Sequence, residues 1–196
     1  MFRAMELIAA SRIGRARAEA QAAVPFSRAI TRALSAAATH ADVDHPLTSE
    51  RSDTNKVAVL VLTADRGMAG AYNASVLREA ERLLARLVEA GKEPHLYVAG
   101  RRGVGYFTFR HRDMERTWLG DSDRPDLERA EDIASTLLDA FQATAAEGGV
   151  SEIHLVYTRF LSMVTQEPRV VRILPLEVVD GVAPAGEEPL PLYDFE

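Results

Sequence analysis

The sequence predicts an α/β protein whose mostly parallel, doubly wound (Rossmann-like) sheet has helices on both faces and follows a long N-terminal coiled-coil helix. Apolar, β-branched runs alternate with amphipathic helical patterns from residue 56 to residue 179, which is the order that builds such a sheet. The first run, Val57 to Leu62, is apolar at every position, as in a strand covered on both faces. Residues 1–38 are alanine-rich, which predicts the long helix.

The long helix carries a stripe of small side chains. The stripe runs from Met5 through Ala20 to Ala23 or Val24 in steps of about three and four residues, which is the spacing of a coiled coil. Such a seam lets a second helix approach closely but buries too little apolar area to fold alone. We therefore expect a partner helix, in this chain or another. Pro25 has no backbone N–H and should kink or interrupt the helix near Val24.

Residues 39–55 are polar and contain Pro46, so we expect a linker there. The α/β body should follow at 56–179, and residues 180–196 should be an acidic tail rich in proline and glycine. The elements expected within the body are a strand at 57–62, a helix at 74–90, a strand at 96–99, a short helix at 101–109, an edge strand around 116–118, a helix at 126–147, and strands at 153–157 and 164–174. The last strand should be antiparallel, because too few residues precede it for a helical crossover.

Two helices of the body have apolar faces that should pack on the sheet. In the helix at 74–90 this face is expected to consist of Leu77, Ala80, Leu84, Leu87 and Val88. In the helix at 126–147 it is expected to consist of Leu127, Ala130, Ala134, Leu137, Leu138 and Phe141.

The charge is unevenly distributed along the chain. Residues 1–40 contain six arginines and two glutamates, a balance of +4, and because the whole chain carries −6 the remainder carries −10. A basic arm on an acidic body argues against a nucleic-acid binder. It suits either a helix that meets an acidic partner or an ordinary solvated face. There is no cysteine, and no apolar run reaches membrane-spanning length.

The loop from Thr63 to Gly70 follows the first strand, at an edge where open α/β sheets bind ligands. A nucleotide site there is disfavoured, since the segment has neither GxGxxG spacing nor a Walker lysine. Two readings remain open: a tight glycine turn, and a protein-contact loop that presents Arg66. The five histidines show no metal-ligand spacing, and no serine lies in a nucleophile elbow. We therefore expect no catalytic residue, cofactor or metal site.

Three separated segments together resemble the gamma subunit of rotary ATP synthases. They are Arg3 to Arg12 (RAMELIAASR), Thr63 to Asn73 (TADRGMAGAYN), and Thr165 to Pro168 (TQEP) leading into the late strand. Weaker agreement adds Gly100 to Gly103 and Ser122 to Pro125. Their order and spacing extend the resemblance over essentially the whole chain.

The resemblance implies a non-catalytic rotary shaft. In that family, paired N- and C-terminal helices sit inside a ring of alternating alpha and beta catalytic subunits. The α/β base lies near the membrane-embedded c-ring and beside the epsilon subunit, at the cytoplasmic face of the bacterial cell membrane. The loop would then present Arg66 to an acidic lever of a beta subunit. The subunit-contact residues implied for this chain are Met5, Ile8, Arg12, Asp65, Arg66, Gly67, Met68, Ala69, Gly70, Gln166 and Pro168.

The sequence departs from the family at both ends. It begins inside the expected first helix and stops before the long C-terminal helix, which would be the partner that the small-residue stripe requires. Two other functions compete with the shaft: a small α/β phosphate- or nucleotide-binding enzyme that uses Gly67–Gly70, and a standalone interaction module. Titration with nucleotide or phosphate separates the enzyme from the shaft.

Overall fold

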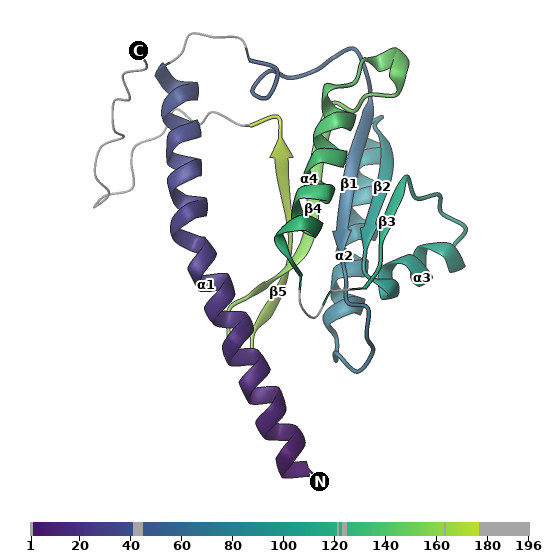
Figure 1. Ribbon diagram of the computed structural model, residues 1–196. Helices are drawn as coiled ribbons and strands as arrows, with labels where there is room; N and C mark the ends of the chain where they lie inside the picture. Colours follow the sequence, from purple (N-terminus) through teal and green to yellow (C-terminus); the bar gives the residue numbers. More distant parts are fainter. Residues whose placement is uncertain (1, 41–44, 121, 123–124, 163, 177–196) are drawn as a thin grey trace. The chain divides into compact units, whose positions relative to one another are not determined.

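The computed structural model describes residues 2–40, 45–120, 122, 125–162 and 164–176, with the side chains of the first helix described for residues 9–33. The chain forms two compact units, and each is considered by itself. One comprises residues 1–44 and 178–196, and the other comprises residues 45–177. Figure 1 shows the first helix of the one unit and the sheet with its helices in the other.

Helix α1 spans Phe2–His40 and continues through Pro25. The helix is therefore not interrupted near Val24, and the predicted kink there stays a prediction. Proline removes one main-chain donor, and in a helix of 39 residues the bonds on both sides of that gap remain. Val24, Phe26 and Ile30 expose 41, 71 and 44% of their surfaces. The helix does not bury these apolar side chains by itself, and its pairing in a coiled coil stays a prediction.

The α/β unit contains one five-stranded sheet in the order β3-β2-β1-β4-β5. The strands are β1 (Lys56–Leu62), β2 (Glu93–Ala99), β3 (Arg116–Trp118), β4 (Glu152–Phe160) and β5 (Gln166–Leu174). The first four are parallel, and β5 runs antiparallel to β4. The predicted sheet class and the antiparallel last strand are confirmed.

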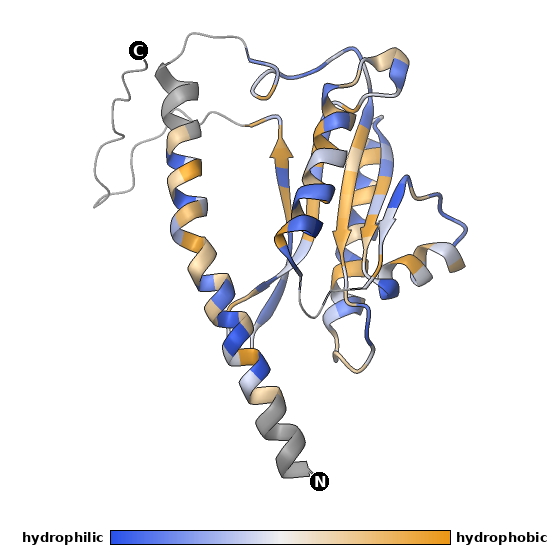
Figure 2. Cartoon of the chain, in the orientation of Figure 1, coloured by the Kyte–Doolittle hydropathy of each residue, from blue (hydrophilic) through white to orange (hydrophobic). Residues whose placement is uncertain are grey.

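Helices cover both faces of the sheet, as predicted (Figure 1). Helices α2 (Tyr72–Glu89) and α3 (Arg101–Phe109) pack on one face, and α4 (Leu127–Gln142) packs on the other. Side chains alternate along a strand. Val57, Val59 and Val61 of β1 therefore pack in the core with α2 and α3, and Ala58 and Leu60 pack in the core with α4. The central strands are accordingly among the most apolar parts of the unit (Figure 2).

The buried face of α2 differs from the predicted one: it also includes Val76 and Leu83 and leaves out Val88. Leu77, Leu84 and Leu87 are buried, together with Ala80. Val88 is 59% exposed, so its inclusion was wrong. It lies in the last turn of α2, where the neighbouring Glu89 and Ala90 are also exposed.

Helix α4 differs more from its prediction. Only Leu137 and Phe141 of the expected face are buried, whereas Leu127 and Leu138 are 73 and 37% exposed, and Ala130 and Ala134 are exposed too. Ile133 and Ala140, which were not predicted, are partly buried against the same core as Leu137 and Phe141. The predicted set of residues on this face was therefore wrong.

Helix α4 also ends earlier than the predicted Glu147. The guanidinium of Arg51 donates to the carbonyl oxygens of Phe141 and Ala143, which satisfies groups left open at a helix end. A separate 3₁₀ turn, Ala145–Glu147, then begins with Thr144 and Glu147 in a reciprocal capping box. The side-chain caps, which composition did not reveal, stop the helix at Gln142.

Candidate functional site

The loop after β1 begins at a buried threonine that joins it to the loop after β2. The Thr63 hydroxyl donates to Ala99 O at 2.8 Å and accepts from Gly103 N at 2.9 Å. Gly100 has φ +97°, and a Cβ atom there would overlap the Thr63 carbonyl group. Only glycine combines that backbone conformation with so close an approach. The two loops are therefore held together at their bases.

Asp65 extends this anchoring to the loop after β3. Its carboxylate accepts hydrogen bonds from the backbone N–H groups of Arg101 (2.9 Å), Gly120 (3.1 Å) and Ser122 (3.1 Å). The Ser122 hydroxyl accepts in turn from Asp65 N at 2.8 Å. Burial by itself would raise the pKa of Asp65, but these hydrogen bonds favour the ionised form and hold the pKa below its ordinary 3.8. One side chain thus ties three loops together.

The tip of the loop is exposed above this anchored base. Arg66, Ala69 and Gly70 are exposed, and Met68 is fully exposed. Met68 has φ +59° and Gly70 has φ +55°, so two left-handed residues shape the turn. A fully exposed methionine beside an exposed arginine is typical of a surface that contacts another protein.

The beginning of α3 offers no open cradle for a phosphate. Its first three backbone N–H groups already donate to Asp65 Oδ1, Ala64 O and Thr63 Oγ1. A phosphate at a helix N-terminus needs such donors free. No cluster of three or more potential metal ligands occurs among the described residues. The loop is consequently better suited to protein contact than to phosphate chemistry.

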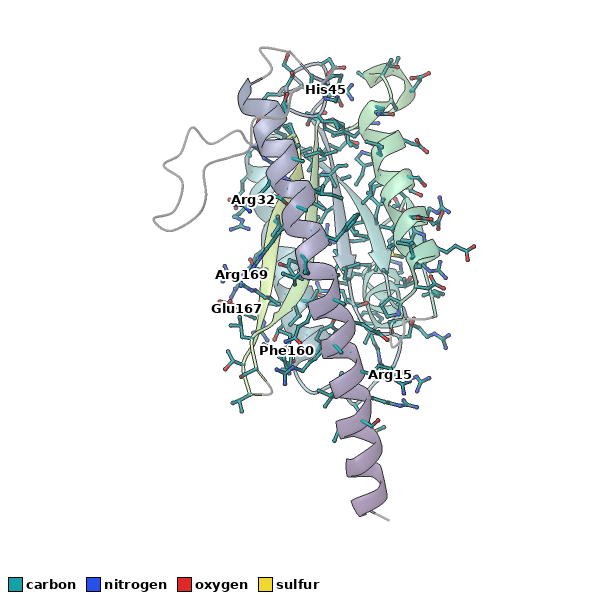
Figure 3. The ribbon with its side chains drawn as sticks, turned by 60° about the vertical axis from the view of Figure 1, so that its left-hand side comes forward. Arg15, Arg32, His45, Phe160, Glu167 and Arg169 are labelled. Carbon is teal, nitrogen blue, oxygen red and sulfur yellow. The ribbon has the colours of Figure 1, made fainter. Side chains whose placement is uncertain are left out.

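The remaining contact residues expected from the sequence are distributed over both units. Gln166 is exposed and pairs with Phe160, and Pro168 is half-buried and pairs with Thr158. Because β1 and β4 are adjacent and parallel, the hairpin from β4 to β5 rises from the same sheet edge as the loop of Asp65. Figure 3 shows Phe160 at that hairpin and Glu167 and Arg169 along β5.

Three of the expected contact residues lie on the first helix, which belongs to the other unit. Arg12 is exposed on α1, and the side chains of Met5 and Ile8 lie outside those described. None of the described helices is both long and apolar enough to cross a bilayer.

Sequence reasoning missed two features near the loop. It did not foresee that Ser122 closes the site through its hydrogen bonds with Asp65. It also did not foresee that Arg101 and Arg102 line a groove between α2 and α3. The arginine pair directly after β2 was the available signal for the second feature, whereas nothing local indicated the first.

The whole chain, residues 1–196, matches the protein-family model described as ATP synthase. It is 71% identical over 196 residues to the ATP synthase gamma chain of Beutenbergia cavernae and 53% identical over 196 residues to that of Arthrobacter sp.. The chain belongs to the ATP synthase gamma-chain family. It covers 66% of the length of each of these two gamma chains.

A solved structure supports the fold of this gamma-chain family member. The central stalk and c-ring structure of the Tetrahymena thermophila mitochondrial ATP synthase contains a chain that matches with a TM-score of 0.50 at 20% identity. The match covers 65% of this chain and 53% of that one. At this identity the likeness concerns the arrangement of sheet and helices alone.

Proposed function

We propose that this gamma-family chain is part of the non-catalytic central shaft of a proton-translocating ATP synthase. In this role it couples rotation of a membrane c-ring to ATP synthesis or hydrolysis in an alpha–beta ring. The observation that carries the proposal is the 71% identity to a gamma chain over the full 196 residues. The exposed loop tip on a hydrogen-bonded base supports it.

The mechanism we propose is mechanical. A shaft acts on the ring by presenting different surfaces to the catalytic sites as it turns, and nucleotide affinities change only as far as those differential contacts allow. Arg66, with Met68 and Ala69 beside it, would contact an acidic lever of a beta subunit. Because Asp65 ties the base of the loop to two other loops, force applied at the tip would be carried into the sheet.

Further partners and the location follow from the same proposal. Helix α1 would pair with a C-terminal helix of the full-length subunit. The α/β unit would lie beside the epsilon subunit and near the c-ring. The protein would then be peripheral to the membrane at its cytoplasmic face, held there through the complex.

The second candidate is a small phosphate- or nucleotide-binding enzyme built on the loop from Gly67 to Gly70. The loop leads into α2 and has neither GxGxxG spacing nor a Walker lysine, which counts against this function. Calorimetric titration with ATP, ADP and phosphate separates the two functions, since the shaft predicts no saturable binding at this loop.

Co-purification tests the shaft. We expect the chain, co-expressed with the alpha and beta subunits of its own synthase, to elute with an alpha–beta assembly. Arg66→Glu should reduce the co-eluting amount about tenfold, equivalent to about 1.4 kcal/mol, because it places like charges face to face. Arg159→Glu is the matched control, since Arg159 is exposed on β4. Equal losses for both variants, or no co-elution of the unmodified chain, would refute the proposal.

A further inference from the structure

A groove of about 890 Å³ lies between α2 and α3, next to the anchored loop. Its charged and aromatic lining comprises Asp65 from the loop, Arg78 and Glu81 from α2, and Arg101, Arg102, Tyr106 and Arg110 from α3 or its end. Gly105 also lines it, and a Cβ atom at that position would meet nothing within 4 Å. Arginines from two helices thus border one open concavity.

The acidic groups of the groove are already engaged. The Asp65 carboxylate accepts three backbone hydrogen bonds. Glu81 forms an ion pair with Arg112 at 2.9 Å and lies 3.9 Å from Arg110. Neither carboxylate neutralises Arg78, Arg101 or Arg102. These three guanidinium groups therefore give the groove an excess of positive charge in a unit that is acidic as a whole.

The lack of internal partners distinguishes these three arginines from most others in the unit. Eight arginines of the described part of residues 45–176 form ion pairs with carboxylates: Arg51, Arg82, Arg86, Arg110, Arg112, Arg116, Arg169 and Arg172. Within that same part, the guanidinium groups of Arg78, Arg101 and Arg102 have neither an ion pair nor a hydrogen bond. Most of the described arginines of this unit are thus paired, and these three unpaired ones line one groove.

The position of Arg102 connects the groove to the loop. A Cβ atom at Gly67 would overlap the end of the Arg102 side chain, so the guanidinium lies against the loop where glycine leaves room for it. The backbone N–H of Arg102 donates to Ala64 O at 3.0 Å. The cations are thus held on anchored elements rather than on a free chain end.

We propose that this groove binds an acidic polypeptide segment of a partner protein. Arginine recognises carboxylates through paired N–H groups. Arginine side chains from α2 and α3 can therefore bind a peptide segment that lies between the two helices. A small phosphate ligand is a poorer fit, because the N–H groups at the beginning of α3 are taken and the groove is wide and open. Binding at this groove depends on its arginines and not on the shaft function.

Fluorescence anisotropy with a short fluorescein-labelled oligoglutamate peptide tests the proposal on the full chain. We expect saturable binding that weakens with added salt. The triple variant Arg78→Gln, Arg101→Gln, Arg102→Gln should bind at least about tenfold more weakly. The control triple variant Arg82→Gln, Arg86→Gln, Arg159→Gln removes the same charge from exposed positions outside the groove, and its affinity should stay within about twofold.

Three outcomes would overturn the proposal: no binding by the unmodified chain, equal weakening in both triple variants, or saturable binding of pyrophosphate or ATP in place of the peptide. The first two would show that the arginines form no specific site, and the third would assign a small polyphosphate ligand. Unchanged fluorescence of the buried Trp118 in each variant verifies that the unit is folded.

Discussion

Replacing Asp65 with alanine should destabilise the α/β unit, because this carboxylate joins three loops. It accepts backbone hydrogen bonds from Arg101, Gly120 and Ser122 at 2.9, 3.1 and 3.1 Å. Bonds to an ionised, buried acceptor contribute more than neutral ones, but Asp65 is only partly buried, so water would replace part of each bond. At about 1 kcal/mol per bond, the variant should lose about 3 kcal/mol of unfolding free energy.

Urea unfolding followed by tryptophan fluorescence measures this loss. Trp118 is the single tryptophan of the chain and is 3% exposed, and its carbonyl oxygen accepts from Gly100 N at 2.8 Å. It therefore reports on the loops that Asp65 joins. Asp113→Ala is the control, since Asp113 is exposed and its loss should change stability by less than about 0.5 kcal/mol. A loss below about 1 kcal/mol in the Asp65 variant would refute the reasoning.

Two further predictions concern the same unit. Gly100→Ala should lower the free energy of unfolding by more than about 3 kcal/mol or abolish soluble expression, because the methyl group would overlap a carbonyl oxygen at a φ of +97°. Gly105→Ala should leave the free energy of unfolding nearly unchanged, as measured by calorimetry or urea unfolding. Burial alone would raise the pKa of Glu152, but hydrogen bonds from Lys92 and a neighbouring histidine hold the pKa below its ordinary 4.5. The stabilisation is therefore complete above about pH 4.5 and is lost as the pH falls through the lower folded-state pKa. Glu152→Gln should flatten the pH dependence of the urea unfolding midpoint below about pH 4.5. A midpoint that changes with pH as steeply as in the unmodified chain would contradict this prediction.

The strands and α2 could be predicted because their buried residues form a local, regular pattern of apolar positions in the sequence. A run such as Val57 to Leu62 is apolar at every position, and only a strand covered on both faces requires that. The apolar face of α4 could not be predicted in the same way. Its apolar residues allow more than one packed face, and the core takes up Leu137 and Phe141 with Ile133 and Ala140 beside them. Which residues of a helix are covered depends on the neighbouring layer.

The candidate loop was recognised from its sequence, but its construction was not. The residues from Thr63 to Gly70 are consecutive, so the glycines and the arginine of the loop can be recognised as one motif in the sequence. The partner of Asp65 in the third loop, Ser122, lies 57 residues away. No local pattern relates the two residues, because a parallel sheet brings its loops together only after the strand order is established.

From the sequence alone came the family, the α/β class, the order of the elements and the position of the candidate loop, since motif order and short-range periodicity carry that information. Tertiary structure alone decided that Asp65 ties three loops together and that Arg78, Arg101 and Arg102 line one groove, with no ion pair to any of the described residues. Arginines look alike in a sequence. Whether a carboxylate neutralises one of them depends on which side chains the packing of helices on the sheet brings within reach.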